Sequence, residues 1–307
     1  MAKILFTDLV GCAHPLQLAG MGGVSTVELA VAVSNAGGLG MIAAAGIPKD
    51  TLGEMLETLD AATEGPFGAN FLMPFLDPEA IPIAAERCRV VEFFYGEPDR
   101  ALVEIVHSKG ALVSWQVGSL EEAEVALEAG CDLIVAQGIE AGGHVRGKRD
   151  LASLLEETTH LTIPIVAAGG IGSAEALACA LETPASAVRV GTRFIAATES
   201  GAHPAYVHAL IDASAEDTLI TEEFDVGWPN APARVLRSSL EAARSGEDPT
   251  ATVGDERWPV PRFSTLPPTK DSSGNIAAMP HYAGFSVNGV QKRQPAAEIV
   301  AELCSRL

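Results

Sequence analysis

The sequence predicts a (β/α)₈ TIM barrel that carries a helical and loop extension over the barrel mouth. Short apolar runs of β type alternate with helical patterns from the N-terminus to about residue 200. Several runs are continuously apolar, as expected for parallel strands covered by helices. Glycines and polar residues follow the ends of many runs. A doubly wound sheet, the structural alternative, would gather them at one switch point, so the barrel is favoured.

The eight predicted strands are 15–20, 38–45, 67–74, 90–96, 111–118, 132–138, 164–170 and 187–194. Helical patterns lie between them. One opens with a Ser25–Glu28 capping box and closes at Gly37. Another runs from Ser119 to Gly130, and a third, 173–182, follows the seventh strand. The repeating strand–helix unit is the one that builds a barrel.

The pattern changes after residue 200, so we divide the chain into a barrel domain, 1–200, and an extension, 201–307. In the extension, 233–246 is predicted as one helix and the Pro, Gly, Ser and Asp-rich stretch 246–275 as a long loop. The last helix, 295–307, starts at Pro295 and is a candidate for completing the barrel wall.

Composition excludes several classes of function. The 307 residues carry 20 Lys and Arg against 40 Asp and Glu, a net charge of −20 without a long basic run, which argues against nucleic acid binding. The five cysteines are scattered without a CxxC, and no HExxH occurs, so neither a disulfide framework nor a metal site is expected. No apolar run has the length of a membrane span. We expect a reduced, cytoplasmic protein that binds no membrane.

Two glycine-rich loops follow the seventh and eighth strands, "AAGGIGS" (167–173) and "VGTRF" (190–194). In barrels these loops often bind a phosphate through backbone N–H groups. The predicted cradle is Gly169, Gly170, Gly191 and Thr192. Because the sequence has neither a P-loop nor a GxGxxG fingerprint, FMN or a sugar phosphate is favoured over ATP.

Five blocks in order along the chain carry a family resemblance: "LAGMGGVSTVELAVAVSNAGGLGMI", "PFGANFLMP", "IVAQGIEAGGHVRG", "IPIVAAGGIGSAEAL" and "VRVGTRFIAATES". Together they resemble the nitronate monooxygenase family. They are also similar to the FMN-dependent enoyl-acyl-carrier-protein reductases. Both resemblances imply an FMN-binding TIM barrel.

The resemblance also implies roles for particular residues. Ala19, Gly20 and Met21 would flank the flavin ring, and Asn70 and Gln137 would hydrogen-bond the flavin or its ribityl chain. Gly142 and Gly143 would let their loop approach the ring. The resemblance assigns the phosphate to Gly169, Gly170, Gly191 and Thr192, the same cradle that the two glycine-rich loops predict. Gln116, on the fifth strand, is assigned to the cofactor as well.

His144 matches the family's active-site histidine. A nitroalkane has an acidic α-proton that an imidazole could remove, and an imidazolium would stabilise the resulting nitronate anion. The implied reaction is FMN-dependent oxidation of alkyl nitronates by O₂ to carbonyl compounds and nitrite. The expected partners are therefore a small-molecule substrate and O₂, and a homodimer is left open.

Other residues leave alternatives open. Arg146, Lys148 and Arg149 follow His144 and would suit a phosphate of NAD(P)H or a thioester, or simply face water. The first reading favours an NAD(P)H-dependent reductase of an enoyl thioester, on CoA or acyl-carrier protein, or of a quinone. A non-enzymatic flavin-binding module is the third hypothesis.

Two tyrosines are further candidates for substrate contact. Tyr95 follows the fourth strand, where an aromatic packing wall is the competing interpretation. Tyr282 lies in 279–289, which resembles a family block that closes the active site. Phe285 stands there where the family usually has a glutamine.

Overall fold

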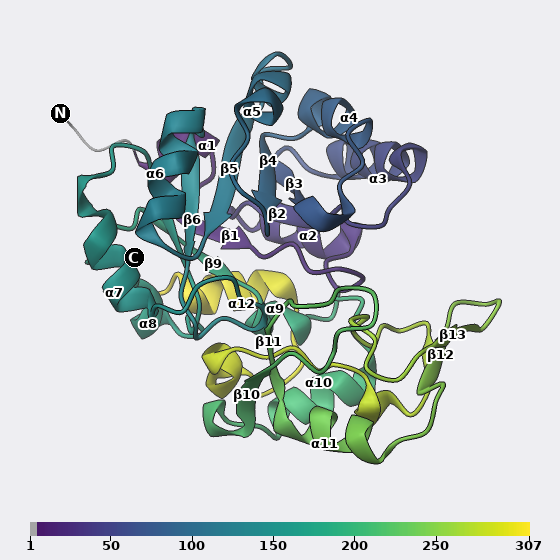
Figure 1. The fold of residues 1–307 in the computed structure, drawn as a ribbon. Coiled ribbons are helices and arrows are strands. Elements are labelled where there is room, and N and C mark those ends of the chain that lie inside the picture. Colours follow the sequence, from purple (N-terminus) through teal and green to yellow (C-terminus); the bar gives the residue numbers. More distant parts are fainter. Residues whose placement is uncertain (1–4) are drawn as a thin grey trace.

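The computed structural model describes residues 5–307, in which eight parallel strands confirm the predicted barrel (Figure 1). Their order is β1-β9-β8-β6-β5-β4-β3-β2. The barrel closes between β1 and β2, because the Leu18 N–H donates to the Leu39 carbonyl at 2.9 Å and the Leu39 N–H donates to the Leu16 carbonyl at 2.8 Å. The strands are β1 (Leu16–Leu18), β2 (Gly40–Ala43), β3 (Phe67–Leu72), β4 (Val90–Phe94), β5 (Leu112–Val117), β6 (Leu133–Gln137), β8 (Ile165–Ala168) and β9 (Ala187–Val190).

The eighth predicted strand is too long, because β9 ends at Val190 and the next residues form the short helix α9 (Thr192–Ile195). The helices around the barrel are α2 (Val27–Asn35), α3 (Lys49–Ala62), α4 (Ala80–Arg87), α5 (Arg100–His107), α6 (Leu120–Ala129), α7 (Leu151–Glu157) and α8 (Ala174–Leu181). Helix α1 (Phe6–Val10) precedes β1, and the 3₁₀ turns η1 (Met73–Phe75) and η2 (Thr158–His160) lie in the connections.

One predicted helix cap is correct and one is wrong. The Ser119 side chain caps α6 by accepting a bond from the Glu122 N–H. Helix α2, by contrast, is capped by Thr26. The Ser25 hydroxyl instead accepts from the Met21 N–H at 3.0 Å and donates to the Ala19 carbonyl at 2.9 Å. Ser25 therefore braces the loop that follows β1.

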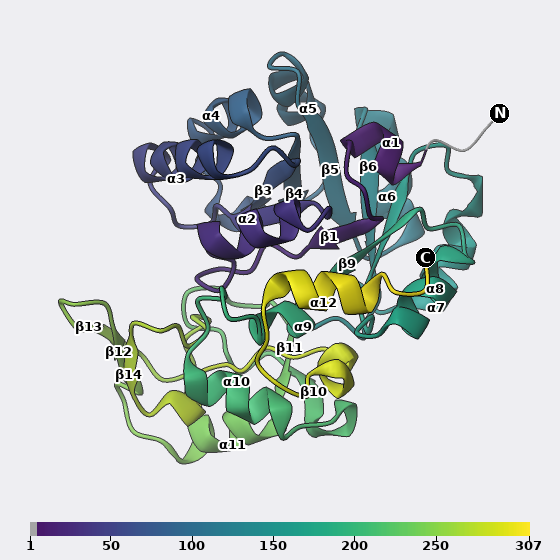
Figure 2. The same cartoon turned by 180° about the vertical axis from the view of Figure 1, so that it is seen from behind.

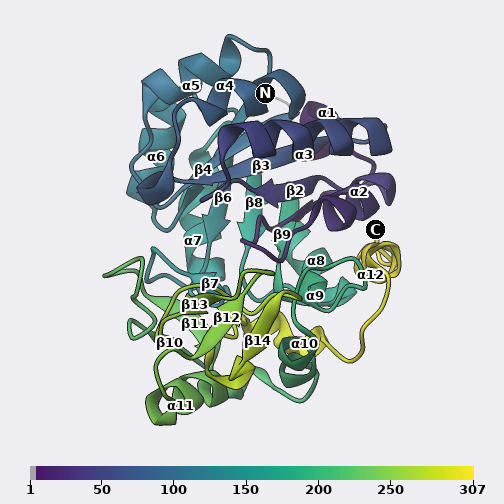
Figure 3. The same cartoon turned by 90° about the vertical axis from the view of Figure 1, so that its right-hand side faces the viewer.

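The extension contains more β-structure than the sequence predicts. Within 233–246, the first residues form strand β11 (Ala233–Leu236), and only Arg237–Ser245 is helical, as α11. The stretch 246–275 holds a three-stranded sheet, β12 (Ala251–Val253), β13 (Trp258–Val260) and β14 (Ser272–Gly274), where a loop was predicted (Figure 3). Each strand has only three residues, too few to show alternation among so many Pro and Gly residues. The other elements are α10 (Pro204–Ile211), β10 (Thr218–Thr221), η3 (Ala215–Asp217), η4 (Ile276–Ala278) and η5 (Phe285–Gly289).

The last helix, α12 (Ala296–Leu303), leaves the extension and lies against the barrel wall (Figure 2). Its Ile299, Val300 and Leu303 are fully buried in the same hydrophobic core as Leu16 of β1 and Leu29 of α2. Burying such side chains stabilises the fold by roughly 1.5–3 kcal/mol each. The extension is thus fastened to the barrel at both of its ends.

Within residues 5–307, no helix has both the length and the apolar character needed to cross a membrane. The same part of the chain contains no cluster of three His, Cys, Asp or Glu side chains that could hold a metal ion. The five cysteines are free thiols, and only Cys179 is exposed.

The interior of the barrel holds a buried polar network around Glu92 of β4. Its carboxylate pairs with Arg189 of β9 at 2.6 Å and accepts hydrogen bonds from Gln17 at 2.9 Å and from Asn70 at 2.8 Å. Arg189 also donates to the Gln116 oxygen at 2.5 Å. The network ties five strands together through buried side chains, so each charge depends on its partner.

Replacing Glu92 with Gln should therefore destabilise the barrel by about 3 kcal/mol, because Arg189 would stay buried without a counter-charge. Urea unfolding measures the change. Glu79→Gln, which breaks an exposed pair with Lys49, is the matched control and should leave the unfolding midpoint unchanged. A Glu92→Gln midpoint equal to that of the wild type would contradict this interpretation.

Candidate active site

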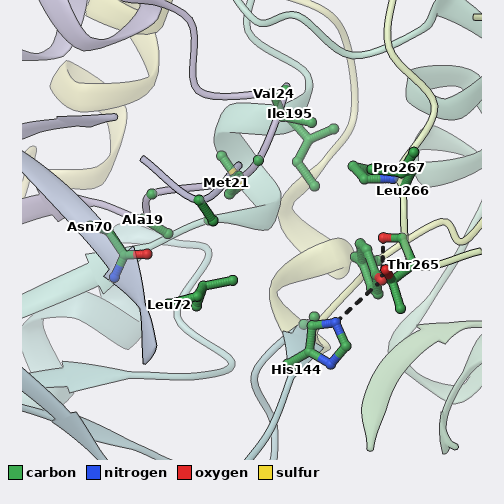
Figure 4. A pocket seen from close by; sticks show the side chains of 18 of the residues that line it. Ala19, Met21, Val24, Asn70, Leu72, His144, Ile195, Thr265, Leu266 and Pro267 are labelled. Atoms are coloured by element: carbon green, nitrogen blue, oxygen red, sulfur yellow. Dashed lines mark hydrogen bonds between the residues drawn. The ribbon is translucent and has the colours of Figure 1, made fainter. Parts of the chain in front are cut away.

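A cavity of about 640 Å³ lies at the C-terminal ends of the barrel strands, between the barrel and the extension (Figure 4). Loops from the barrel form its inner wall, and residues 226–286 of the extension form most of its outer wall. Fourteen of the predicted site residues line it, namely His144, Tyr282 and the cofactor set Ala19, Gly20, Met21, Asn70, Gln116, Gln137, Gly142, Gly143, Gly169, Gly170, Gly191 and Thr192. Tyr95, Arg146, Lys148 and Arg149 do not line it.

The loop after β1 approaches β3 too closely for a side chain. A Cβ at Gly20 would lie 2.7 Å from the Asn70 Cβ, so only glycine fits there. Asn70 donates its amide to Glu92, and this bond fixes the orientation of its side chain. Gln116 is fixed in the same way by Arg189. The polar floor of the cavity is therefore held by the network inside the barrel.

The two predicted phosphate loops lie beside each other in the cavity wall. Gly169 and Gly170 have φ angles of 121° and 73°, which favour glycine, and they follow β8 directly. Among the described residues, the backbone N–H groups of Gly169, Gly170 and Gly191 have no acceptor. Unpaired N–H groups at the start of helices and in such loops form an anion site.

The Thr192 side chain contacts the extension as well as the cavity. Its Oγ1 accepts a hydrogen bond from the Gly284 N–H at 3.1 Å. The hydroxyl proton stays available for a second acceptor. Thr192 therefore links the predicted phosphate loop to the segment that covers it.

The loop after β6 carries His144 and is held from both sides. The Gln137 amide donates to the His144 carbonyl at 3.0 Å, and its oxygen accepts from the Arg146 N–H at 3.4 Å. Gln137 thus positions the loop, and because it also lines the cavity, its contact with the cofactor stays a prediction. On the other side, Gly143 and His144 form the short strand β7 (Gly143–His144), which pairs antiparallel with β11 of the extension.

Glycine is needed at positions 142 and 143 for different structural reasons. A Cβ at Gly142 would lie 2.4 Å from the Gly284 nitrogen, so this glycine is required by close packing against the extension. Gly143 has a φ of 75°, and no atom lies within 4 Å of its Cβ position. The sequence assigned both glycines to the space beside a flavin. Both glycines line the cavity, so that assignment stays a prediction.

Hydrogen bonding fixes the tautomer of the His144 imidazole. Nδ1 lies 3.1 Å from the Ala231 carbonyl oxygen, so Nδ1 must carry a proton and donate it. Nε2 is then unprotonated in the neutral ring. It lies 3.5 Å from the Tyr282 hydroxyl, which gives its own proton to the Thr265 carbonyl at 2.8 Å. The Nε2 lone pair is therefore free to accept a proton from a ligand.

Burial lowers the pKa of His144 from 6.5 to about 4, although its bond to Ala231 acts in the opposite direction. The ring packs against Trp228, with centroids 4.0 Å apart. Tyr95 packs behind Trp228 at 4.6 Å, which fits the aromatic wall more closely than substrate contact. His144 is thus a neutral base at pH 7 in a largely desolvated position.

The basic residues after His144 do not converge on a common point. Arg146 forms an ion pair with Glu122, and Arg149 pairs with Glu157 at 3.1 Å. Lys148 is exposed. Two of the three charges are therefore neutralised by neighbouring carboxylates.

Sequence reasoning missed several residues of the site. Arg189 and Glu92 are charged residues inside apolar strands, a pattern that signals a buried pair, and Arg189 lines the cavity. Trp228, Ala231 and Thr265 come from the extension, and nothing local in the sequence marks them as neighbours of His144.

The closed barrel, with a cavity at the carboxyl ends of its strands and a neutral histidine in the wall, defines the class as a TIM-barrel enzyme. The chain belongs to the nitronate monooxygenase family, whose model matches residues 3–81 and 79–306. Family and relatives together identify an FMN-dependent oxidoreductase.

Two curated relatives illustrate the range of the family. A nitronate monooxygenase of Pseudomonas aeruginosa is 31% identical, over 98% of both chains. A (3aS,4S,5R,7aS)-5-hydroxy-7a-methyl-1-oxo-octahydro-1H-indene-4-carboxyl-CoA dehydrogenase of Mycobacterium tuberculosis is 34% identical, over 78% of this chain and 68% of that protein.

Two solved structures share the whole fold. FabK from Thermotoga maritima superimposes with a TM-score of 0.79 at 27% identity, covering 99% of this chain and 96% of that one. Nitroalkane oxidase from Streptomyces ansochromogenes gives a TM-score of 0.78 at 30% identity, covering 98% and 97%.

The contact between Gly142 and Gly284 gives a prediction for the cavity roof. Gly142→Ala should push the extension away from the barrel, raise the apparent Kd for FMN and destabilise the protein by roughly 1–3 kcal/mol. Fluorescence titration of the apoprotein and thermal unfolding measure the two effects. Gly53→Ala on α3 is the control, since the added methyl group would make only an ordinary contact with Ile83 at 3.7 Å and Gly53 does not line the cavity. Equal effects of the two substitutions would refute the role of the Gly142 contact.

Proposed function

We propose that this enzyme oxidises alkyl nitronates, supplied as such or formed from nitroalkanes, with O₂ to give carbonyl compounds and nitrite. The observation that carries the proposal is the neutral His144, whose Nε2 faces the cavity while Nδ1 is held by the Ala231 carbonyl. A base with this tautomer can remove the α-proton of a nitroalkane.

The cavity residues fit FMN. The free N–H groups of Gly169, Gly170 and Gly191 would hold the phosphate, and Asn70 and Gln116, fixed by Glu92 and Arg189, would present oriented polar groups to the flavin. Gly143 leaves open space beside its backbone. When bound, FMN would supply the electron acceptor for the nitronate and the electron donor for O₂.

The protein's own part is proton transfer and charge control. Nε2 of His144 takes the α-proton, and the ring becomes an imidazolium next to the new nitronate anion. Burial disfavours the imidazolium before the anion exists, and the anion stabilises it afterwards. The Trp228 ring packs on one face of His144 and the Tyr282 hydroxyl lies near Nε2, so these two side chains limit the space beside the imidazole.

The second candidate is an NAD(P)H-dependent reductase of an enoyl thioester or quinone, which the full-length likeness to FabK supports. The charges of the cavity argue against this second candidate. Arg189 is the one Lys or Arg of the described chain that lines it, and Glu92 neutralises it. A nucleotide or CoA phosphate in this cavity would find no unpaired cationic side chain.

Nitrite formation distinguishes the two candidates. With a propyl nitronate and air, the FMN-loaded enzyme should consume O₂ and release nitrite without any pyridine nucleotide. Both are measured in the same sample, with an oxygen electrode and a colorimetric nitrite assay. NADPH oxidation that depends on a 2-enoyl thioester, with no nitrite from the nitronate, would establish the reductase instead.

His144→Asn should lower kcat/KM much more for the neutral nitroalkane than for the preformed nitronate. For a neutral nitroalkane, kcat/KM should fall about a hundredfold or more, because the base is lost. For the preformed nitronate, whose proton is already gone, the loss should be smaller than tenfold. His208→Asn changes an exposed histidine on α10 and serves as the control. Equal losses with both substrates would remove His144 from the proton-transfer step.

The pH dependence follows from the lowered pKa of His144. The imidazole stays unprotonated as the pH falls until the pKa of about 4 is reached. With a neutral nitroalkane, the acid limb of kcat/KM should therefore have its midpoint near pH 4, well below the 6.5 of an unperturbed histidine. Initial rates between about pH 3 and pH 8 measure it, and a midpoint near 6.5 would contradict the burial argument.

A further inference from the structure

A second, smaller pocket lies among the helices outside the barrel. Its volume is about 230 Å³, and it is found where α12 packs beside α8 and α9 (Figure 2). Four segments line it: the start of α8, Arg193 of α9, the stretch 289–294 and the end of α12. In the part of the chain that the structure describes, it shares no lining residue with the larger cavity. A ligand can therefore occupy this pocket while the larger cavity is full.

Two buried side chains at this pocket have nitrogen atoms without an acceptor. Arg193 is 5% exposed and Gln294 is 4% exposed, and both line the pocket. Within residues 5–307, nothing accepts a hydrogen bond from Nε of Arg193 or from Nε2 of Gln294. Only four buried side-chain atoms of that part of the chain are unpaired, and the two at this pocket are both donors. Because an unpaired buried donor is costly, such a pair indicates the place of a ligand that accepts hydrogen bonds.

Further donors surround these two nitrogens. The Ala174 N–H lies in the first turn of α8, where the helix offers it no acceptor. The Ser173 hydroxyl accepts from the Ala176 N–H at 3.2 Å, so its own proton remains available to a ligand. Lys292 adds an exposed ammonium group. The pocket therefore offers donors from a helix start, a hydroxyl and an ammonium group.

The charges that line the pocket are positive in sum. The Arg193 guanidinium pairs with Glu302 of α12 at 2.6 Å, so these two charges compensate each other. Lys292 is the remaining charged residue of the lining. Since the Glu302 carboxylate already accepts from Nη2 of Arg193, the acceptor for the unpaired donors has to come from a ligand.

We propose that this pocket binds a phosphate group, either as the free ion or as part of a phosphomonoester. A phosphate combines negative charge with several acceptor oxygens, and helix N-termini, ammonium groups and unpaired N–H donors are the groups that bind it. The site is separate from the FMN cradle after β8 and β9, because that cradle lines the larger cavity. It does not depend on the proposed reaction.

A phosphate in this pocket would join the barrel to the segment that covers the larger cavity. Gly172 and Ser173 follow β8, whereas Lys292 and Gln294 follow η5. The two segments already pack closely, because a Cβ at Gly172 would lie 2.7 Å from the Ser286 carbonyl oxygen. Ser286 lines the larger cavity, so a ligand that holds these segments together should slow the release of FMN.

Titration of the FMN-loaded enzyme tests the proposal, since FMN then occupies the cradle in the larger cavity. Isothermal titration calorimetry with inorganic phosphate and with glycerol phosphate, a phosphomonoester, should show one site with a Kd of about 1 mM or lower. Tighter binding of glycerol phosphate would identify a phosphomonoester as the ligand, and equal or tighter binding of phosphate would identify the free ion. Binding of neither compound would overturn the proposal.

Two substitutions locate the anion. Lys292→Gln removes the ammonium group, and Gln294→Met removes the unpaired donor while a side chain of similar length remains, so each should raise the Kd about tenfold. Without phosphate, Gln294→Met should unfold at the same midpoint as the wild type, because the lost donor had no partner. Lys109→Gln, which breaks an exposed pair with Glu86 away from the pocket, is the control and should leave the Kd unchanged. An unchanged Kd in both pocket variants, or an equal rise in the control, would overturn the proposal.

The rate of FMN release tests the connection to the larger cavity. After dilution of the FMN-loaded enzyme, the fluorescence of released FMN should rise more slowly with phosphate at about ten times its Kd than without it. The same phosphate concentration should have a smaller effect on Lys292→Gln. A release rate that phosphate leaves unchanged would reject the connection between pocket and cavity and leave the anion site standing.

Discussion

The antiparallel pairing of β11 with Gly143–His144 is the constraint on which the site depends. It joins the extension to the loop that leaves β6, and it brings the Ala231 carbonyl, just before β11, to Nδ1 of His144. Trp228, a few residues before β11, packs against the imidazole and contributes to its burial. Tautomer, pKa and access of the catalytic ring are therefore set by a segment almost 90 residues further along the chain.

The barrel could be predicted from the sequence because its signals are local. Each strand is a short apolar run, and a cap such as Ser119 marks the start of a helix within a few residues. Local signals also explain the errors. Ser25 and Thr26 are both good caps, and only the contact of Ser25 with the Ala19–Met21 loop decides between them. The sheet within 246–275 depends on pairing between strands of three residues, which no local pattern specifies.

The residues of the candidate site that have local sequence signals could also be predicted. Glycines at strand ends and the histidine after "EAGG" could be recognised in the sequence, and the structure brings them to one cavity. The reason for a particular glycine could not be read, since Gly142 is required by Gly284 and not by open space. Nor could the neutralisation of Arg146 and Arg149, because Glu122 lies in α6 and Glu157 at the end of α7, and only the fold brings them to the loop after β6.

The neutral state of His144 is a consequence of its burial in the wall of the cavity. Burial lowers the pKa of His144, so the imidazole stays neutral until it takes a proton from the substrate. Anaerobic stopped-flow spectroscopy of the FMN-loaded enzyme tests this account most directly, with nitronate, NADH and NADPH mixed in separately. Bleaching of the flavin by the nitronate alone is the predicted result, and bleaching only by a pyridine nucleotide would contradict it.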